Sequence, residues 1–556
     1  GSATRSTDVD LLSFTSGTDG LRVFSNTAPC SVGESVSFAG DLNGDGHTDL
    51  LIGAPKCTTA TGSHAGIVYI LYGRAAPATF QDLSLSSITA SLITVTRLIG
   101  AYSSGNLGIA VTGLGDMNGD GIDDIGVGAR GATINGNANA GVAYVLFGNS
   151  SFHQRAEVDL GTFQSGKTGF RIFGVEANDQ LGSYISAAGD LNGDGLSEVI
   201  ICANTASSMG HTGAGMAVIV AGKPTSYSYS DILRSDDLVT TGIGRRIYGA
   251  YTTDGFGIAA DVAGDMNRDG VPDFMISAYQ AGSTRAGIVY IFYGQSSGSL
   301  GPDIYLNASL RGDFGLRMLG AETSGSFGYS MAYLGDVNGD GGDDWAFAAH
   351  MQTALGRATA GTTYVYLGTP PPSVAPTASP IPTTAPSASP TYLTKEIDLA
   401  NIGTTQLPGV TMVGATIDAR LGRQVVGLGD FNGDGLSDFA MGVSYGMLGS
   451  VHVGIVYVFY GRTDIALVNS MDLQNFTSSA VTGIRIYGTA EGDGAGYSVA
   501  GAGDLNEDGY ADILVGAAGA TVSSGDPAGI VYVLYGGSHI ADIHLSSFVT
   551  GPQGYR

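Results

Sequence analysis

The chain has little cysteine, tryptophan, histidine and positive charge. Its 556 residues include 3 Cys, 1 Trp and 8 His, and its 24 Lys and Arg stand against 50 Asp and Glu, which gives a formal net charge of −26. Nucleic-acid phosphates require a basic surface, so we expect no nucleic-acid partner. No apolar run approaches the roughly eighteen residues that cross a bilayer, so we expect no transmembrane segment in this chain.

The sequence also lacks the motifs of common catalytic sites. It has no nucleophile elbow, no His-Glu-x-x-His pair and no phosphate-binding loop followed by a helix, and its few histidines are scattered. We therefore predict that the chain is not an enzyme and has no catalytic residues.

Glycine is abundant, with 89 residues, and a nine-residue pattern rich in Asp and Asn occurs seven times. The pattern is Asp-x-Asn-x-Asp-Gly-x-x-Asp, and only the third copy differs, because it ends in Glu198. A hard divalent cation takes about six to eight oxygen ligands, and the side chains at positions 1, 3, 5 and 9 with the carbonyl at position 7 supply them. Glycine at position 6 permits the sharp turn around the ion. The pattern predicts up to seven Ca²⁺ sites of structural role.

The predicted ligands share these five positions in every loop. In chain order they are Asp41, Asn43, Asp45, His47 and Asp49; Asp116, Asn118, Asp120, Ile122 and Asp124; Asp190, Asn192, Asp194, Leu196 and Glu198; Asp265, Asn267, Asp269, Val271 and Asp273; Asp336, Asn338, Asp340, Gly342 and Asp344; Asp430, Asn432, Asp434, Leu436 and Asp438; and Asp504, Asn506, Asp508, Tyr510 and Asp512. The side chain at position 7 varies widely, as a main-chain ligand permits. Seven divalent ions would reduce the net charge from −26 to −12.

Two other interpretations of these loops were considered. An EF-hand needs a Glu at position 12 and a helix on each side, whereas position 12 here is always apolar and a short strand-like run follows each loop. A solvated acidic turn without metal is credible for one copy, since Asp, Asn and Gly are ordinary turn residues. Seven copies in phase favour the metal.

The loops mark a long internal repeat. Successive loops begin 75, 74, 75, 71, 94 and 74 residues apart, so one unit has about 74 residues and one unit carries an insertion. Each unit contains a strand that ends in Gly-Asp, the acidic loop, a second strand, a variable connection and two more strands. Four antiparallel strands per unit and seven units predict an all-β, seven-bladed β-propeller.

The two ends of the chain predict how the ring closes. The segment from Val9 recurs in the segment from Ile543, so the chain ends in the phase in which it began. One end must supply the fourth strand of a composite last blade. We expect the N-terminal copy to do so, because it continues through Leu21, Val23 and Phe24.

These units resemble FG-GAP repeats, the blades of the integrin α-subunit head and of related secreted propellers. Phe256-Gly257 and Phe327-Gly328 match the first signature, Gly53-Ala54-Pro55 matches the second, and other repeats carry variants such as Leu107-Gly108 and Leu421-Gly422. The resemblance covers nearly the whole chain except a proline-rich stretch. Integrin α heads carry acidic loops on only some blades, so seven is a departure from that family.

Several features favour an extracellular setting, either secreted or at the cell surface. Calcium loops of this kind fill where calcium is millimolar. Three glycosylation sequons, at Asn149, Asn307 and Asn475, all follow a third strand. Cys30 and Cys57 flank the first two strands of the first repeat, so a disulfide is possible, whereas Cys202 aligns inside a strand and is expected to be a buried free thiol.

Three further segments need interpretation. Residues 370–390 hold eight prolines. We interpret them as an excursion between the third and fourth strands of the fifth blade, within one domain of residues 1–556. The alternative is a linker between two domains of five and two repeats. Arg311-Gly312-Asp313 spells an integrin-recognised tripeptide, and Asp82-Leu-Ser-Leu-Ser86 resembles a metal-dependent adhesion motif. Both lie in repeated connections and are interpreted as coincidences.

The leading functional hypothesis is a calcium-stiffened extracellular propeller for adhesion or recognition, similar to an integrin α head. We expect its protein or glycan ligand on the face opposite the acidic loops, formed by the connections after the second and fourth strands. Tyr102, Tyr251, Tyr279, Tyr445, Arg130 and Arg285 lie in those connections. The alternatives are a lectin or matrix-binding module and a non-catalytic domain of a secreted hydrolase.

Overall fold

The computed structural model describes residues 20–25, 29–73, 83–85, 95–208, 210–234, 238–282, 284–306, 315–368, 396–404, 407–465, 470–479, 482–521, 527–538 and 542–545. Nearly all of its regular elements are β-strands. The described 3-10 helices are single turns, η2 (Phe152–Gln154), η3 (Leu399–Asn401) and η5 (Leu473–Asn475). Within these ranges, no helix has the length and apolar character needed to span a bilayer.

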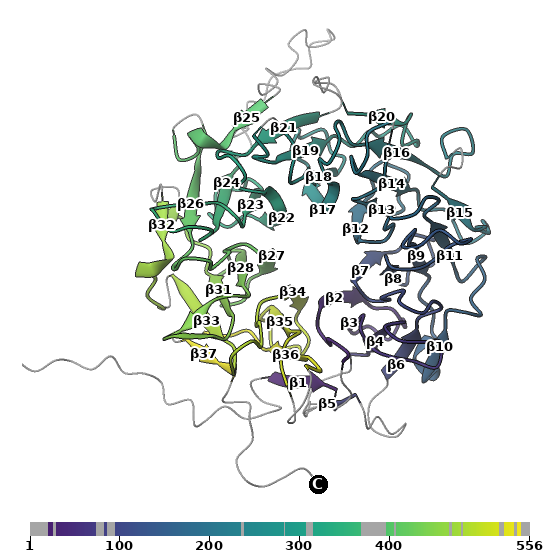
Figure 1. The fold of residues 1–556 in the computed structure, drawn as a ribbon, viewed down its shortest axis with the longest axis horizontal. Helices are drawn as coiled ribbons and strands as arrows, with labels where there is room; N and C mark the ends of the chain where they lie inside the picture. Colours follow the sequence, from purple (N-terminus) through teal and green to yellow (C-terminus); the bar gives the residue numbers. More distant parts are fainter. Residues whose placement is uncertain are drawn as a thin grey trace, which may run out of the picture.

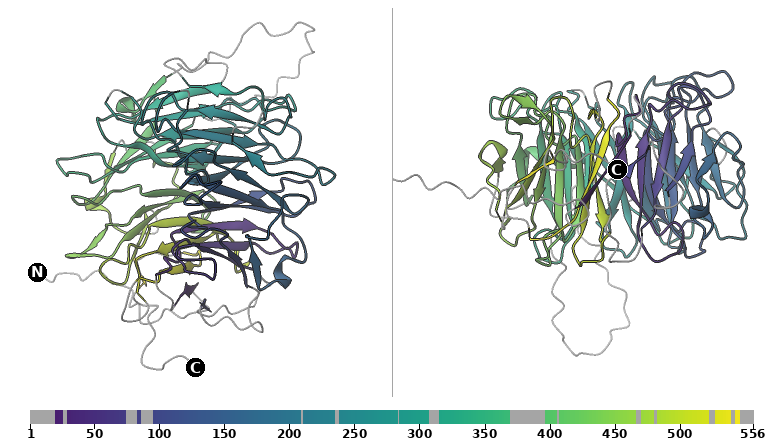
Figure 2. Two further views of the ribbon diagram at one scale, coloured as in Figure 1. Left: turned by 45° about the vertical axis from the view of Figure 1, so that its right-hand side comes forward. Right: turned by 90° about the horizontal axis from the view of Figure 1, so that it is seen from below.

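The strands form seven five-stranded sheets arranged as a ring around a central axis (Figure 1). The prediction of a seven-bladed β-propeller is therefore confirmed. Seen from the edge, the strands span the thickness of the ring and their connections lie at its two faces (Figure 2).

Each blade has its first strand nearest the axis. From the axis outward, blade 1 contains β2 (Ser35–Gly40), β3 (Asp49–Ala54), β4 (Ile67–Leu71), β6 (Val95–Ile99) and β10 (Glu157–Asp159); blade 2 contains β7 (Ala110–Gly115), β8 (Asp124–Ala129), β9 (Val142–Leu146), β11 (Gly169–Phe173) and β15 (Ile232–Leu233); blade 3 contains β12 (Tyr184–Gly189), β13 (Glu198–Ala203), β14 (Met216–Val220), β16 (Gly244–Tyr248) and β20 (Ile304–Tyr305).

The remaining blades repeat this order. Blade 4 contains β17 (Phe256–Gly264), β18 (Asp273–Ala278), β19 (Ile288–Phe292), β21 (Gly315–Leu319) and β25 (Glu396–Asp398); blade 5 contains β22 (Phe327–Gly335), β23 (Asp344–Ala349), β24 (Thr362–Leu367), β26 (Gly409–Val413) and β32 (Ser470–Asp472); blade 6 contains β27 (Gln424–Gly429), β28 (Asp438–Val443), β31 (Ile455–Phe459), β33 (Gly483–Tyr487) and β37 (Ile543–His544); blade 7 contains β34 (Ser498–Gly503), β35 (Asp512–Ala517), β36 (Ile530–Leu534), β1 (Gly20–Phe24) and β5 (Leu83–Ser84). A small hairpin joins β29 (Met447–Leu448) to β30 (Val451–His452).

Blade 7 is composite, and the expected terminus closes it. Strand β1 pairs antiparallel with β36, from Gly20 opposite Leu534 to Phe24 opposite Ile530. The ring therefore closes with the N-terminal strand beside C-terminal strands, as predicted. The C-terminal copy of the same sequence forms β37, which pairs parallel with β33 of blade 6.

Each sheet carries a fifth strand that the sequence analysis did not include. This short strand comes from the following repeat and pairs parallel with the fourth, for example β15 with β11 and β20 with β16. An arginine of the fourth strand pairs with an acidic residue of the connection or fifth strand in several blades, as in Arg171 with Asp231 and Arg246 with Asp303. The fifth strand thus ties each blade to the next repeat.

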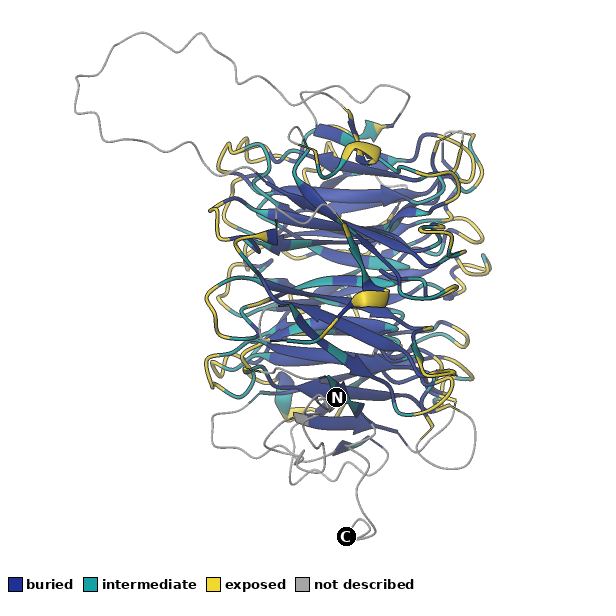
Figure 3. Cartoon of the chain, turned by 90° about the vertical axis from the view of Figure 1, so that its left-hand side faces the viewer, coloured by how far each residue is buried: buried dark blue, intermediate teal, exposed yellow. Residues whose placement is uncertain are grey.

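The hydrophobic core is divided among the blade interfaces. The second and third strands of each blade are apolar runs buried on both faces, as in β3 and β4. The described residues form seven hydrophobic clusters, one between each pair of neighbouring blades. Figure 3 shows buried strands across the ring and exposed connections at its faces.

The predicted proline-rich excursion at 370–390 lies outside the described residues. The strands that flank it, β24 and β26, pair antiparallel in one sheet, from Thr362 opposite Val413 to Tyr366 opposite Gly409. The assignment of the chain as a single domain stays a prediction.

Candidate functional site

The acidic loops join the first and second strands of every blade. Because all blades have the same orientation in the ring, the seven loops lie on one face. At position 6 the glycine has a positive φ in each loop, for example +88° at Gly46 and +93° at Gly509. A side chain at this position would be strained, so the turn requires glycine.

The carboxylates at positions 1 and 5 accept hydrogen bonds from the backbone of their own loop. In the first loop, Asp41 Oδ1 accepts from the amide of Asp45 at 2.9 Å and Asp41 Oδ2 from the amide of Gly46 at 2.7 Å. Asp45 Oδ1 accepts from the amide of His47 at 3.0 Å. The bond from the position-6 amide to position 1 recurs in all seven loops. The loops therefore fold alike and hold these side chains on their inner side.

The carboxylate at position 9 is fully buried and holds the loop to the blade. Asp49 Oδ2 accepts from the amide of Leu42 at 3.0 Å, and Asp49 Oδ1 accepts from the amide of Gly73, just after the third strand, at 2.8 Å. Equivalent bonds reach the start of the loop and the end of the third strand in the other six blades.

Burial raises the pKa of these position-9 carboxyls. It raises the pKa of Asp49 to about 7 and that of Asp124 to about 8, against the effect of the backbone amides, and the neighbouring loop carboxylates raise it further. Charge at this position is therefore costly unless a cation lies nearby.

The asparagine at position 3 offers an oxygen that suits a metal. Asn43 Oδ1, Asn118 Oδ1 and Asn192 Oδ1 are buried and accept no hydrogen bond. A buried polar atom without a partner is costly, and an ion would satisfy it. In the other four loops this oxygen accepts from the position-5 amide, as Asn267 Oδ1 does from Asp269 at 2.9 Å.

The residues present fit Ca²⁺ in their chemistry, since every predicted side-chain ligand is an oxygen donor and a carboxylate oxygen that accepts one hydrogen bond can also bind an ion. The structure brings positions 1, 3 and 5 together through these loop hydrogen bonds. Within the described ranges, however, no group of three or more His, Cys, Asp or Glu side chains is arranged closely enough to hold a metal ion. The carboxylate at position 9 accepts instead from backbone amides and, in blades 2 and 3, also from the side-chain amide of Asn118 at 3.4 Å and of Asn192 at 2.7 Å.

Neighbouring loops also contact each other. In blades 2, 3, 6 and 7 the position-8 amide donates to the position-1 carbonyl of the preceding blade, as Asp123 does to Asp41 at 3.2 Å and Ala511 to Asp430 at 2.9 Å. In blade 4 position 8 is Pro272, which has no amide hydrogen. His47 of blade 1 lies 2.9 Å from Glu507 of blade 7, across the closure.

The six residues expected on the opposite face are not equivalent. Tyr251, Tyr445 and Arg285 are exposed, whereas Tyr102 packs against the core between blades 1 and 2. Arg130 lines a central cavity of about 710 Å³, whose wall is formed by first strands of all seven blades. The ring of Tyr279 lies 6.0 Å from that of Tyr329. Tyr329 and the nearby Arg420 and Arg423 were not among the residues predicted from the sequence.

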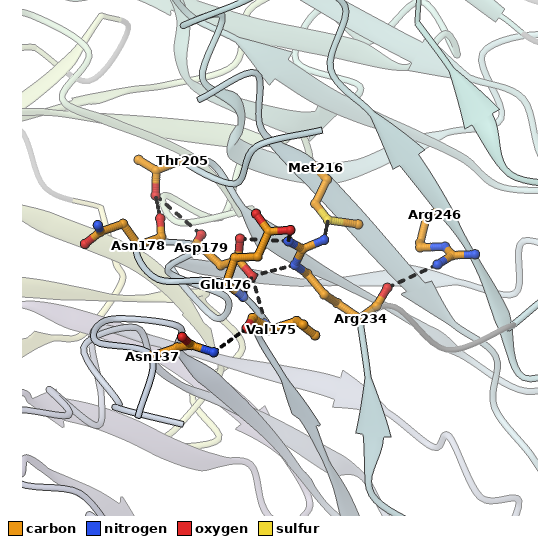
Figure 4. A network of polar contacts seen from close by, with 9 residues as sticks. All are labelled: Asn137, Val175, Glu176, Asn178, Asp179, Thr205, Met216, Arg234 and Arg246. Carbon is orange, nitrogen blue, oxygen red and sulfur yellow. Dashed lines mark hydrogen bonds and ion pairs between the residues drawn. The ribbon is translucent and has the colours of Figure 1, made fainter. Parts of the chain in front are cut away.

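A buried ion pair lies on this face between blades 2 and 3 (Figure 4). Arg234 donates through Nε and Nη2 to Asp179, at 2.5 and 3.0 Å, and Glu176 lies 3.5 Å from the same guanidinium. Asp179 also accepts from the amides of Val175 and Glu176, both at 2.8 Å. Because every charge in this network is paired and bonded, we assign it a structural role.

The cysteines lie as the sequence suggested. Cys30 and Cys57 are joined by a disulfide, and Cys202 is a buried free thiol whose pKa is raised to about 12 by burial. Of the sequons, Asn149 and Asn475 follow third strands, and Asn307 lies outside the described residues. Arg311-Gly312-Asp313 is also outside them, and of Asp82-Leu-Ser-Leu-Ser86 only residues 83–85 are described.

Known proteins share these repeats. Residues 32–71, 256–292, 422–459 and 495–534, in blades 1, 4, 6 and 7, match the FG-GAP repeat. The chain is 30% identical over 209 residues to integrin alpha-IIb of Mus musculus, which is 37% of this chain and 16% of that protein. It is 26% identical over 261 residues to integrin alpha-V of Gallus gallus, or 46% of this chain and 19% of that protein.

The chain is also similar to a second group of proteins, which are named as phospholipases. The chain is 32% identical over 166 residues to phosphatidylinositol-glycan-specific phospholipase D of Homo sapiens, which is 29% of this chain and 17% of that protein. The matches thus span less than a fifth of the length of these relatives.

The fold defines the protein as a seven-bladed β-propeller, and four of its blades match the FG-GAP repeat. Among known propellers of this class, it is similar to the integrin alpha subunits.

Proposed function

We propose that the protein is a calcium-binding extracellular β-propeller that acts as a non-enzymatic adhesion or recognition module. The observation that carries this proposal is the separation of its two faces. Seven acidic loops occupy one face, whereas exposed tyrosines and arginines such as Tyr251, Tyr445 and Arg285 occupy connections on the other. Calcium would stiffen the first face, held by the side chains at positions 1, 3, 5 and 9 and the carbonyl at position 7, and the second face would bind the ligand.

The covalent chemistry of the chain supports the proposed compartment. A disulfide between Cys30 and Cys57 persists in oxidising environments outside the cytosol. Asn475, in one of the sequons, is exposed and accessible to a glycan. The similarity of the chain to integrin alpha subunits supports the adhesive role.

One alternative is favoured by a specific observation. The similarity to phosphatidylinositol-glycan-specific phospholipase D suggests a non-catalytic propeller within a longer secreted hydrolase. Activity measurements on the full-length gene product, with and without this propeller, would separate that alternative from adhesion. A lectin is the other alternative.

Binding assays with matched tyrosine variants test the recognition role. The propeller, in millimolar calcium, is applied to a glycan array and to a biotinylated cell-surface extract. We expect binding that Tyr251→Ala and Tyr445→Ala weaken, and that Tyr305→Ala leaves unchanged. Tyr305 is a suitable control because it is 51% exposed, against 47% for Tyr251, but lies on the outer strand β20. A glycan ligand would favour the lectin. Absence of any ligand, or equal losses in all three variants, would contradict the proposal.

A further inference from the structure

Half of the described arginines form an ion pair with a carboxylate. Ion pairs hold Arg97, Arg171, Arg234, Arg246, Arg317, Arg357, Arg462 and Arg485. Two neighbours on the face opposite the acidic loops, Arg420 and Arg423, have no such partner within the described part of the chain. Arg130, Arg155, Arg245 and Arg285 also lack such a partner there, but Arg420 and Arg423 lie together, since both act on the ring of His350.

Arg423 is held between two aromatic rings. It stands just before the first strand of blade 6, and its guanidinium carbon lies 4.2 Å from the ring centre of Tyr497 in blade 7 and 5.6 Å from that of Tyr329 in blade 5. Its Nη1 donates to the hydroxyl of Tyr329 at 2.9 Å. All three side chains line the central cavity of about 710 Å³. Stacking orients the planar guanidinium and leaves further N–H donors for a ligand.

Arg420 occupies a turn position, two residues before the glycine of the FG signature, that has the same backbone conformation in every repeat. Its φ is +56°, in the left-handed region, and the equivalent residue of every other repeat also has a positive φ: Ser31, Asn106, Gln180, Gly255, Ser326 and Gly494. This turn belongs to the repeat, and what distinguishes Arg420 is a long cationic side chain at a position where the other repeats have small or neutral residues. The guanidinium of Arg420 stacks 4.6 Å from the ring centre of Tyr445, and its Nε is buried without a hydrogen-bond partner.

Surrounding groups do not supply the missing negative charge. The ring of His350 lies against that of Tyr329, with centres 3.7 Å apart and planes tilted by 38°, and its buried Nδ1 has no hydrogen-bond partner. Burial, Arg423 and Arg420 lower the pKa of His350 to about 3, so the ring is neutral at physiological pH. Glu34, also on the cavity wall, is paired with Lys56 at 3.3 Å, and Asp418, which accepts from the hydroxyl of Thr359, forms no ion pair with either arginine in the described part of the chain.

We propose that Arg420 and Arg423 form a binding site for a carboxylate side chain, Asp or Glu, of a partner protein. The proposal deepens the recognition role and rests on it, because it gives the chemical class of ligand for the same face. Guanidinium groups bind carboxylates through paired N–H donors, and such charge-assisted bonds are strong where aromatic rings exclude water. The aromatic rings here already stack on the chain's own cations, so they are poor platforms for a sugar ring.

Retention on immobilised poly-L-glutamate tests this site. The full chain, with millimolar calcium at low ionic strength, should bind the polymer although both carry net negative charge. The double variant Arg420→Gln/Arg423→Gln should bind at least about tenfold more weakly, since it loses two charge-assisted contacts. Arg155→Gln makes the same charge change at an exposed residue in the connection after the third strand of blade 2, away from this site, and should bind within about twofold of wild type.

A conservative variant separates charge from geometry, and two further polymers identify the ligand. Arg423→Lys keeps the charge and should give an intermediate loss, even if the double variant folds poorly. Lack of retention on poly-L-glutamate, or equal retention of wild type and double variant, would overturn the site. Retention on polygalacturonate or heparin alone would overturn the assignment to a protein carboxylate. If a cell-surface ligand is found but binds the double variant as well as wild type, this site is wrong while the recognition role stands.

Discussion

Truncating Phe24 to alanine should destabilise the whole ring, because this side chain lies at the closure. Phe24 ends β1, the strand that completes blade 7, and is 4% exposed. It belongs to the cluster between blades 6 and 7, with Ile484 and Leu545. Removing a buried phenylalanine ring costs its transfer free energy and leaves a cavity, about 3–5 kcal/mol of unfolding free energy in all.

Phe38→Ala is the matched control. Phe38 is also on a strand, β2, but it faces the central cavity and is 50% exposed. About half of its transfer free energy is already absent and no closed cavity is left, so we expect a loss of about 1 kcal/mol or less.

Urea unfolding followed by tryptophan fluorescence measures both variants. The only tryptophan, Trp345, is buried in the cluster between blades 4 and 5, far around the ring from Phe24. If closure stabilises the ring as a unit, Phe24→Ala shifts the Trp345 transition to lower urea much more than Phe38→Ala does. Equal shifts in the two variants, or no shift for Phe24→Ala, would refute the role given to β1.

Three further predictions concern a loop, the excursion and a histidine. Asp504→Ala/Asp508→Ala should lower the melting temperature but leave a folded ring by circular dichroism, because repeat stabilities are roughly additive; complete unfolding would contradict this. After proteolysis within 370–390, the two pieces should elute together in size-exclusion chromatography, and separate folded pieces of about five and two repeats would refute a single ring. Replacing the segment with a short Gly-Ser linker should give a monomer of the same fold. The pKa of His350 is about 3 in the folded chain, below the ordinary value of 6.5, so only the unfolded chain gains this proton as the pH falls below 6.5. Between pH 6.5 and 5, wild type should therefore lose about 1.5 kcal/mol more unfolding free energy than His350→Gln. An equal pH dependence of urea unfolding in the two proteins would contradict this.

Much of the fold could be predicted because the repeat is encoded locally. Each acidic loop fixes the phase of a unit, and apolar runs such as Asp49–Ala54 give the buried strands directly. The closing strand was predictable because Leu21, Val23 and Phe24 continue the N-terminal copy while the C-terminal copy ends. The fifth strand was not included, since two or three residues carry no periodicity. Its signal is an acidic residue followed by an apolar one, as in Asp231-Ile232 and Asp303-Ile304.

The arginine site was not predictable from local sequence. Tyr329, Arg423 and Tyr497 come from three blades and meet only because the ring places equivalent positions side by side. Aligning the repeats on the glycine of the FG signature gives a signal in retrospect, since these three residues each follow that glycine. The unpaired state of the arginines depends on neighbouring side chains, which no alignment within the chain reveals.

Counting bound calcium is the most direct test of the proposal that the acidic loops are metal sites. The protein is dialysed against millimolar calcium, and its bound calcium is measured by elemental mass spectrometry. Thermal melts are then recorded with and without chelator. The account predicts up to seven ions per chain, one fewer in Asp504→Ala/Asp508→Ala, and a lower melting temperature after chelation, because emptied loops leave carboxylates close together. A chain that binds no calcium at millimolar concentration, or one whose melting temperature is unchanged after its metal has been removed, would contradict it.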